Sequence, residues 1–282
     1  MKSSFRTDLG YPVILEFRGP DAVRFLNGQV TQDVTAVDAD RSLPACVTDA
    51  KGKLQFRVYL LEFKPGVLWV TAPTGTAEEL EARLTKYLIA DDVEVTDRSG
   101  EFQLYHLVGQ RPPEGGDAVI RNLSRFGVEG VDLWIPVDYP TDFPDGPDEI
   151  SHEELEDLRI GRGVPAWGSE LVEGMLPPEA NLEATDISYH KGCYIGQEVI
   201  SRIKSAGKVN RSLIKVQLAD DIPAEAGDVL ISDELEGGVL TSVSPISSDG
   251  VRNALGYLKR SADRSDLHVK TRGGIFEIRL KD

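Results

Sequence analysis

The stretch KGCYIGQEVISR, residues 191–202, decides how this sequence is interpreted. It places Cys193 between two glycines, beside Lys191 and just ahead of a short predicted helix that begins near Gln197. A helix N-terminus carries partial positive charge and a lysine is cationic, so both favour the thiolate form of a nearby cysteine. A reactive cysteine is therefore one interpretation. A small buried hydrophobe in a tight glycine turn is the other.

Length and composition indicate an ordinary globular protein. The chain has 282 residues, of which 40% are hydrophobic, so two or three packed units are expected. No apolar run approaches the roughly 20 residues of a membrane span, and the first residues lack the apolar core of a signal peptide. We expect a cytoplasmic protein that has no membrane partner.

Charge and cysteine content exclude several kinds of site. A net charge of -16 repels phosphate backbones, so we expect no nucleic-acid partner. Two cysteines and four scattered histidines cannot build an iron–sulfur or structural zinc site, so no metal site is predicted. Any cluster chemistry would have to involve a partner protein.

The periodicity along the chain predicts an α+β fold. Residues 74–89 give the best helix, because Thr76 and Glu79 form a capping box ahead of an apolar stripe. Strand patterns on both sides of this helix indicate an α+β subdomain over about 45–110. From about 211 to 282, short strand patterns separated by turn residues are typical of a small antiparallel β-barrel or sandwich.

The 191–202 stretch resembles the signature of the YgfZ-type folate-binding proteins, the iron–sulfur-maintenance relatives of the glycine-cleavage T-protein. That signature runs Lys-Gly-Cys-aromatic-x-Gly-Gln-Glu, followed by Arg four residues after the Glu. Eight positions match: Lys191, Gly192, Cys193, Tyr194, Gly196, Gln197, Glu198 and Arg202. Other segments resemble the same family, namely GPDAVRFLNGQVTQDV (19–34), DAKGKLQFRVYL (49–60), LRIGRGVPAWGSEL (158–171), LPPEANL (176–182) and KVNRSL (208–213).

The resemblance implies a three-domain ring of the T-protein and YgfZ type, with tetrahydrofolate in its central hole. Residues 1–44 and 111–210 would form a discontinuous folate-binding domain. Residues 45–110 would form an inserted α+β domain, and 211–282 a C-terminal antiparallel β-barrel.

Two departures from the T-protein pattern favour the YgfZ-type branch. T-proteins carry an acidic pair where this chain has Gln55 and Phe56, neither of which can take a proton. Asp49 lies close in the sequence, but on the other side of the turn. Lys191 and Cys193 are both present where T-proteins typically have Phe-x-Gly. An aminomethyltransferase stays the alternative, and whether the chain is an enzyme stays open.

The resemblance also implies roles for individual residues. Cys193 would be the working thiol, with Lys191 beside it. Glu179 would hold the pterin, because a carboxylate can accept two N–H bonds from an aminopyrimidine edge. A solvent-facing acid after a Pro-Pro turn is the other interpretation of Glu179. Asn27 and Thr31 would line the same cavity.

Four more side chains are candidates for contact with folate. Arg202 and Arg211 could bind the glutamate carboxylates, or could form ordinary ion pairs within the chain. Trp167 and Tyr194 could stack on the pterin, although large aromatic side chains are more often part of a core.

The sequence therefore leads to one hypothesis and two alternatives. The hypothesis is a monomeric protein that binds tetrahydrofolate and assists iron–sulfur clusters, with client enzymes or assembly proteins as its partners. One alternative is the tetrahydrofolate-dependent aminomethyltransferase. The other is a scaffold whose folate cavity is vestigial.

Overall fold

The computed structural model describes residues 3–73, 75–110, 112, 118–139, 148–207 and 209–281. It has the α+β fold expected from the sequence. The chain forms two compact units, described here one at a time. The N-terminal unit contains Lys2–Ile150 and Leu182–Arg202, and the C-terminal unit contains Ser151–Asn181 and Ile203–Asp282. Within the described part of the chain, no helix is long and apolar enough to cross a membrane.

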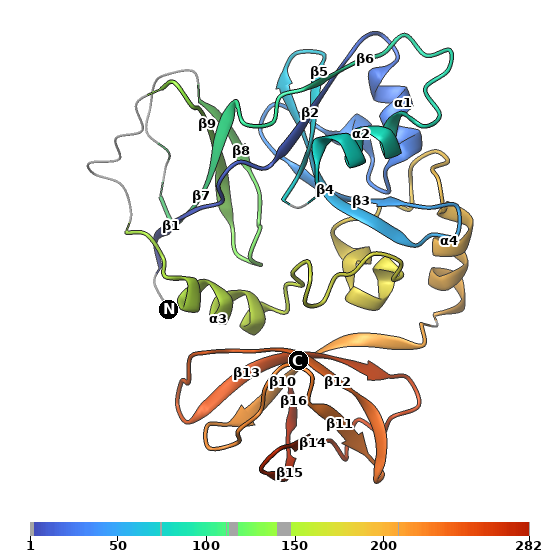
Figure 1. Cartoon of the computed structure of the whole chain (residues 1–282). Coiled ribbons are helices and arrows are strands. Elements are labelled where there is room, and N and C mark those ends of the chain that lie inside the picture. The colour runs from blue at the N-terminus through green and yellow to red at the C-terminus, as the bar shows by residue number, and fades with distance from the viewer. Residues whose placement is uncertain are drawn as a thin grey trace. The chain divides into compact units, whose positions relative to one another are not determined.

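An antiparallel five-stranded sheet organises the N-terminal unit (Figure 1). Its order is β3 (Leu43–Thr48), β4 (Leu54–Lys64), β5 (Val67–Ala72), β2 (Val13–Arg18) and β6 (Glu94–Asp97). One face packs against α1 (Ala22–Gln29) and α2 (Ala77–Thr85), which contribute Phe25, Leu26, Leu80 and Leu84 to the core. The sheet thus has two short helices on one side.

A second antiparallel sheet packs against the opposite face. Its order is β1 (Phe5–Asp8), β7 (Phe102–Val108), β9 (Gly130–Pro136) and β8 (Val119–Asn122). The two sheets meet through aromatic side chains, with Trp69 edge-on to Trp134 at 5.8 Å and to Phe102 at 4.8 Å between ring centroids. Such edge-to-face pairs add stability beyond the apolar area that they bury.

Short helical segments complete the N-terminal unit. These are η1 (Val34–Ala36), η3 (Leu182–Ala184) and the first part of α4 (Gln197–Ala206). The loop between η3 and α4 carries Cys193.

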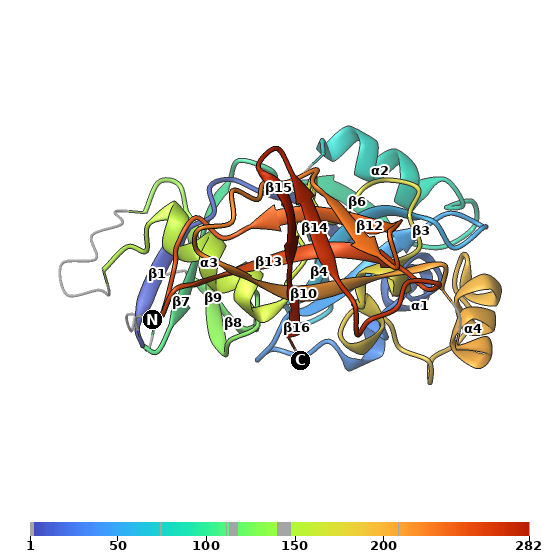
Figure 2. The ribbon, with the colours of Figure 1, turned by 90° about the horizontal axis from the view of Figure 1, so that it is seen from below.

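The C-terminal unit contains α3 (His152–Arg162), η2 (Pro177–Ala180) and an antiparallel seven-stranded sheet. The order of the sheet is β15 (Gly274–Glu277), β14 (His268–Thr271), β11 (Val229–Ser232), β12 (Leu235–Val243), β13 (Val251–Lys259), β10 (Arg211–Ala219) and β16 (Arg279–Lys281). The sheet is curled rather than flat, and β14 and β15 cross β12 and β13 at a steep angle (Figure 2). The antiparallel C-terminal strands expected from the sequence are confirmed.

A buried ionic network fastens residues 151–181 to this sheet. Glu170 is 1% exposed, and its Oε2 accepts a hydrogen bond from Arg159 Nη1 at 2.8 Å. Its Oε1 accepts from the hydroxyls of Thr241 and Ser242 at 2.7 and 2.6 Å. Oε2 also accepts from the Ala166 N–H at 3.0 Å, so each oxygen of this buried carboxylate accepts two hydrogen bonds. The network therefore holds α3 to β12 without an unpaired charge.

The domain boundaries predicted at 44/45 and 110/111 stay a prediction. Strands β3 to β6 of the expected insert pair in one sheet with β2, which precedes it, and β7 pairs with β1 and β9 in the other. The periodicity of a strand identifies it as a strand but does not identify its neighbours, so the insert could not be delimited from the pattern alone.

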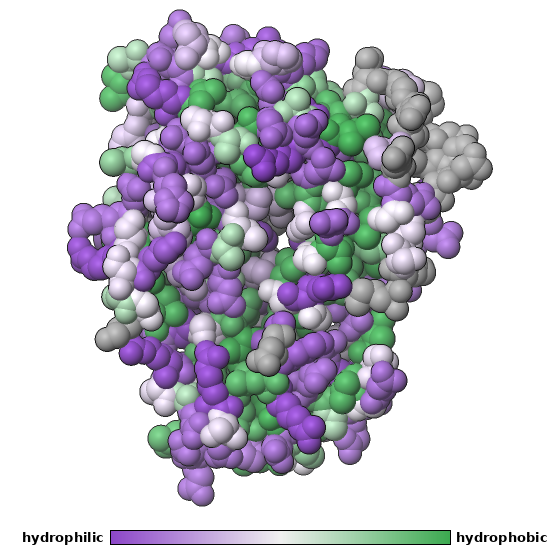
Figure 3. Space-filling model, turned by 180° about the vertical axis from the view of Figure 1, so that it is seen from behind, coloured by the Kyte–Doolittle hydropathy of each residue, from purple (hydrophilic) through white to green (hydrophobic). Residues whose placement is uncertain are grey.

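Hydrophilic side chains are interspersed with hydrophobic ones over the face shown in Figure 3. The chain has 47 acidic and 31 basic residues, and most of these charges are on side chains that remain at least partly exposed. The surface therefore combines a strong negative charge with ordinary apolar content.

Candidate functional site

The loop that carries Cys193 is fastened at Lys191. The ammonium of Lys191 donates to three backbone oxygens, those of Asn27 at 2.6 Å, Val30 at 2.8 Å and Gln32 at 2.7 Å. A lysine has three N–H donors, so all three are used. These carbonyls lie at and just beyond the C-terminal end of α1, where the helix dipole favours a cation. Lys191 is therefore bound to the end of α1 and not to Cys193.

Two effects act on the charge of Lys191. Burial lowers its pKa to about 8, because desolvation disfavours the charged form. The three carbonyl acceptors favour the ammonium, so the cation persists at neutral pH. Its Nζ also lies 5.2 Å from the ring centroid of Tyr194. The side chain of Lys191 thus stabilises the loop. Its predicted action on the Cys193 thiol stays a prediction.

Asn27 and Thr31 belong to the same assembly. Oδ1 of Asn27 accepts from the backbone N–H of Val34, the first residue of η1, at 3.0 Å. The hydroxyl of Thr31, which is fully buried, donates to the Asp186 carbonyl at 2.6 Å and accepts from the Cys46 N–H at 2.8 Å. Both side chains hold the backbone around the Cys193 loop. Their predicted contact with folate stays a prediction.

A close contact between two turns fixes the other end of the loop. A Cβ on Gly196 would lie 2.5 Å from the Asp49 carbonyl oxygen, 2.8 Å from Gly52 Cα and 2.8 Å from Thr48 Oγ1. The Thr48 hydroxyl donates to the Ile195 carbonyl at 2.7 Å. The 49–53 turn therefore packs directly against the backbone of Gly196, the second glycine of the Cys193 motif.

Cys193 itself is exposed, and the next residue is buried. Tyr194 is 7% exposed and packs with Ile187 and Ile200, while Cys46 is fully buried. The interpretation of Cys193 as a small buried hydrophobe is therefore wrong. The side chain of Tyr194 is part of a core, and its stacking on a pterin stays a prediction.

Where T-proteins carry an acidic pair, this chain has Gln55, which belongs to a hydrogen-bond network around Arg83. Oε1 of Gln55 accepts from Arg83 Nε at 2.5 Å, and Arg83 also donates to Gln29 Oε1 and to the Thr48 carbonyl. Burial lowers the pKa of Arg83. Oδ1 of Asp49 accepts from the N–H groups of Lys51 and Lys53 at 2.8 and 2.9 Å, within its own turn.

The C-terminal unit brings Glu179 and Arg211 together. Arg211 Nε donates to Glu179 Oε2 at 3.1 Å, and its guanidinium carbon lies 4.5 Å from the ring centroid of Tyr257. Glu179 is on η2, with its side chain 12% exposed, and Arg211 begins β10 with its side chain 40% exposed. Among the described residues, Oε1 of Glu179 has no hydrogen-bond partner.

These groups fit tetrahydrofolate chemically. A carboxylate oxygen can accept an N–H of the aminopyrimidine edge, whereas the predicted contact of Arg211 with the glutamate carboxylates stays a prediction. Among the residues that the structure describes, no group of three or more metal-binding side chains is present.

Two predicted folate contacts have other surroundings. Arg202 is exposed and pairs with Glu198, one helical turn before it, at 2.6 Å. Trp167 is half-buried beside a bridge to Leu171 that closes the 167–171 turn. The predicted contacts of Arg202 and Trp167 with folate stay predictions.

Sequence reasoning missed two buried ion pairs in the N-terminal unit. Arg57 donates to Asp186 through Nε at 2.7 Å and Nη2 at 3.2 Å, which fixes the start of the Cys193 loop. Arg125 donates to both oxygens of Asp132, and Nδ1 of His106 lies 2.8 Å from the same carboxylate. These partners are far apart in the sequence or lack a motif, so no local signal marks them.

Comparison with known proteins agrees with the resemblance. No family model matches the chain. The chain is 29% identical over 243 residues to the tRNA-modifying protein YgfZ of Sodalis glossinidius, covering 77% of this chain and 72% of that protein. It is 25% identical over 288 residues to the protein of the same name from Cronobacter sakazakii, covering 89% and 87%.

A solved structure has the same fold. The glycine cleavage system aminomethyltransferase T from Bartonella henselae aligns with 99% of this chain and 85% of its own, with a TM-score of 0.83 and 18% identity. The resemblance to the YgfZ-type proteins and the T-protein-like fold are thereby confirmed.

Proposed function

We propose that this chain is a YgfZ-type protein that binds tetrahydrofolate and assists the assembly or repair of iron–sulfur clusters in client enzymes. Its relatives are named tRNA-modifying proteins, so we propose clients that modify tRNA. One observation carries the proposal. The Cys193 loop is held at Lys191, Ile195 and Gly196, yet its thiol is exposed.

An exposed thiol in a fixed loop suits work on a partner. An iron–sulfur cluster needs several thiolates, and Cys193 supplies one while Cys46 is buried. The partner must therefore supply the remaining ligands, or Cys193 must act as a nucleophile toward an electrophile. Both roles need the thiol to be accessible, and both are retained in the proposal.

Folate would be held in part by the C-terminal unit. Glu179 Oε1 would accept an N–H of the pterin, while Arg211 would keep the carboxylate oriented through Oε2.

The tRNA itself would be bound by the client. The net charge of -16 repels a phosphate backbone, whereas an acidic surface is compatible with docking onto a basic enzyme. We therefore propose a cytoplasmic monomer that meets protein partners.

The T-protein-like fold keeps an aminomethyltransferase as the second candidate. That reaction needs a carboxylate near the folate nitrogen. Gln55 cannot take a proton and already accepts from Arg83, and Asp49 Oδ1 accepts from two amides of its own turn. These contacts disfavour the transferase relative to the cluster-assistance role.

The decisive experiment is rescue of an iron–sulfur-dependent tRNA thiolation enzyme in cells that lack their own YgfZ-type protein. Wild type, Cys193→Ala and Cys46→Ala are compared at matched soluble expression. The last variant makes the same chemical change at the buried cysteine. We expect wild type and Cys46→Ala to restore thiolated tRNA and Cys193→Ala to fail.

Other outcomes would change the conclusion in defined ways. Rescue by all three proteins would support a role of this chain in iron–sulfur cluster assistance but would exclude the proposed role of the Cys193 thiol. Failure of the wild type would favour the transferase or the scaffold. An assay for tetrahydrofolate-dependent aminomethyl transfer on the purified wild type then separates those two.

A further inference from the structure

The guanidinium of Arg211 makes two different contacts within the C-terminal unit. Its Nε donates to Glu179 Oε2 at 3.1 Å, and its central carbon lies 4.5 Å from the ring centroid of Tyr257. The first contact forms the pair that is proposed to bind folate. The second contact has no part in that proposal, although it joins Arg211 to a buried aromatic ring on another strand, β13.

The pairing of two strands brings Arg211 and Tyr257 onto one face of the sheet. Arg211 of β10 is directly opposite Lys259 of β13, and Leu213 is directly opposite Tyr257. Residues two apart on a strand point to the same face, so Arg211 and Tyr257 are diagonal neighbours. Diagonal neighbours in an antiparallel pair are close enough for a long side chain to reach an aromatic ring. The contact therefore follows from regular strand pairing and not from a loop.

The ring of Tyr257 is itself fixed in place. Tyr257 is 4% exposed, and its hydroxyl donates to the Glu170 carbonyl at 2.9 Å. Burial raises the pKa of this hydroxyl, so it stays protonated and donates at neutral pH. Glu170 is held in turn by the buried network that fastens α3 to β12. A guanidinium is attracted more strongly to such a desolvated ring than to an exposed one.

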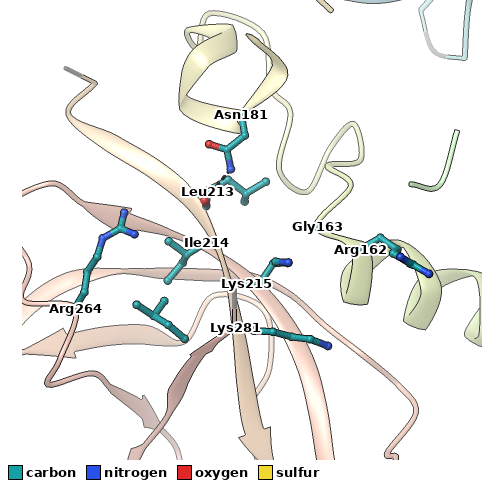
Figure 4. A pocket seen from close by; sticks show the side chains of 9 residues that line it. Arg162, Gly163, Asn181, Leu213, Ile214, Lys215, Arg264 and Lys281 are labelled. Carbon is teal, nitrogen blue, oxygen red and sulfur yellow. Dashed lines mark hydrogen bonds between the residues drawn. The ribbon is translucent and has the colours of Figure 1, made fainter. Parts of the chain in front are cut away.

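The helical turn that carries Glu179 is also fastened to β10. Asn181 ends η2 in the left-handed conformation, with φ of 59°. Its side-chain amide donates to the Leu213 carbonyl at 3.0 Å, and Figure 4 shows this bond among the residues that line a cavity. Leu213 is two residues beyond Arg211 on the same strand. Glu179 and Arg211 therefore extend toward each other from two anchored backbone segments.

The pair divides the two oxygens of the Glu179 carboxylate. Oε2 accepts from Arg211, whereas Oε1 has no hydrogen-bond partner among the described residues. An arginine side chain has many rotamers, and this one is 40% exposed, so a single hydrogen bond would leave it mobile. Contact with a rigid ring restricts the guanidinium to the position in which Nε faces Oε2. The orientation of Oε1 is then restricted as well.

We propose that Tyr257 is the positioning residue of the folate pair, because its ring holds Arg211 against Oε2 of Glu179 and so directs Oε1 at the ligand. This inference rests on the proposed function, which assigns the pair to tetrahydrofolate. Tyr257 acts through Arg211 and does not touch the ligand. A ring with only a packing role would stabilise the unit without ordering Arg211.

Two substitutions separate the ring of Tyr257 from its hydroxyl. Tyr257→Phe keeps the ring beside Arg211 and removes the hydrogen bond to Glu170, whereas Tyr257→Leu removes the ring. Phe276→Leu is the matched control, because it changes a ring to leucine on β15, against the core of the same sheet. All three variants should melt at a lower temperature than the wild type. A change in stability alone therefore does not identify a positioning role.

NMR relaxation of the ¹⁵N-labelled, folate-free full chain measures the order of the Arg211 side chain. The Nε–H signal of Arg211 is the one that disappears in Arg211→Gln. We expect its heteronuclear NOE to indicate a rigid group in the wild type, Tyr257→Phe and Phe276→Leu, and a mobile group in Tyr257→Leu. An Nε–H that stays equally rigid in Tyr257→Leu would overturn the inference, independently of folate binding.

Tetrahydrofolate binding connects this order to the ligand. Tyr257→Leu should raise the dissociation constant about tenfold, whereas Tyr257→Phe and Phe276→Leu should bind like the wild type. Adding Tyr257→Leu to Arg211→Gln should have little further effect, because Tyr257 acts through Arg211. An equally large further loss in that background, or the same loss in Phe276→Leu, would contradict the positioning role.

Failure of the proposed function gives a different pattern. If the wild type does not bind tetrahydrofolate, yet Arg211 loses its order in Tyr257→Leu, the folate part of the proposed function is wrong and the positioning of Arg211 remains supported. If the wild type binds tetrahydrofolate and Tyr257→Leu loses the order of Arg211 but no affinity, the role of Tyr257 in binding is overturned.

Discussion

Gly52 and Gly196 lie back to back, with a Cβ on Gly196 placed 2.8 Å from the Cα of Gly52. Both have positive φ, +71° and +88°, so each turn needs glycine for its backbone as well as for the contact. The DAKGK turn and the KGCYIGQE loop, far apart in the sequence, therefore form one structural feature. Each of these two segments, which both resemble the family, therefore supplies one glycine to the same contact.

This contact predicts different outcomes at two glycines of one motif. Gly196→Ala should lower the free energy of unfolding by about 3 kcal/mol or more, because it adds left-handed strain and a clash with the Asp49 carbonyl. Gly192→Ala should change it by less than about 0.5 kcal/mol, since a Cβ there meets open space. Urea denaturation measures both, and equal effects would contradict the described packing.

The two cysteines should differ in reactivity. Cys193 is exposed, whereas Cys46 is fully buried and burial raises the pKa of its thiol well above the usual value. Iodoacetamide should therefore alkylate Cys193 in the native protein and Cys46 only after denaturation. Peptide mass spectrometry reads out each site, with Cys193→Ser as the control. Rapid native labelling of Cys46 would refute the burial.

Glu179 should matter for folate through its charge. Glu179→Gln keeps the shape but weakens both the Arg211 pair and the acceptance of pterin N–H groups. We expect the dissociation constant for tetrahydrofolate to rise about tenfold or more. Glu183→Gln, at an exposed position on η3, is the control. If Glu179→Gln bound tetrahydrofolate as tightly as the wild type does, the role of the Glu179 carboxylate would be limited to orienting Arg211.

Asp132 should make stability depend on acid pH. Burial would raise the pKa of this carboxyl, but Arg125 and His106 more than offset it, so the pKa lies below 3.8. The stability that it contributes is therefore full above that value and is lost as pH falls through the folded pKa. Asp132→Asn should cost about 3 to 5 kcal/mol at neutral pH, because it leaves Arg125 buried without its partner.

The pH dependence separates this effect from ordinary damage to the core. In urea denaturation, the gap between wild type and Asp132→Asn should narrow as pH falls below about 4. Asp138→Asn, at an exposed position, should follow the wild type at every pH. A gap that stays constant with pH would show that folding does not change the pKa of Asp132.

Local sequence signals predicted several elements well. Thr76 and Glu79 form the expected capping box at the start of α2. Ser151 and Glu154 have the same spacing and form a capping box at the start of α3. Asp21, which precedes α1, is of a residue type that favours helix N-caps, but its carboxylate accepts from the Asp92 N–H and forms no side-chain cap. A cap needs only neighbouring residues, so it is readable from the sequence until a distant backbone group competes for it.

The contacts of the candidate site could not be predicted from the sequence, because they join side chains to backbone groups that are distant along the chain. The motif identified Lys191 and Cys193, but the acceptors of Lys191 are carbonyl oxygens, which every residue possesses. Ion pairs such as Arg57 with Asp186 likewise need the folded chain to bring them together. Side-chain identity therefore proposed the residues of the candidate site, and only the tertiary structure shows the contacts that each side chain makes.

The anchoring of Lys191 also limits how far the thiol can travel. Lys191 is bound to the end of α1 and Tyr194 is buried, so Gly192 and Cys193 form a two-residue bridge between fixed points. Such a bridge can rock about its ends but cannot extend outward like a flexible arm. Under the proposed function, the partner would therefore have to bring the electrophile or the cluster to the sulfur, and the shape of the partner would select which molecules reach it.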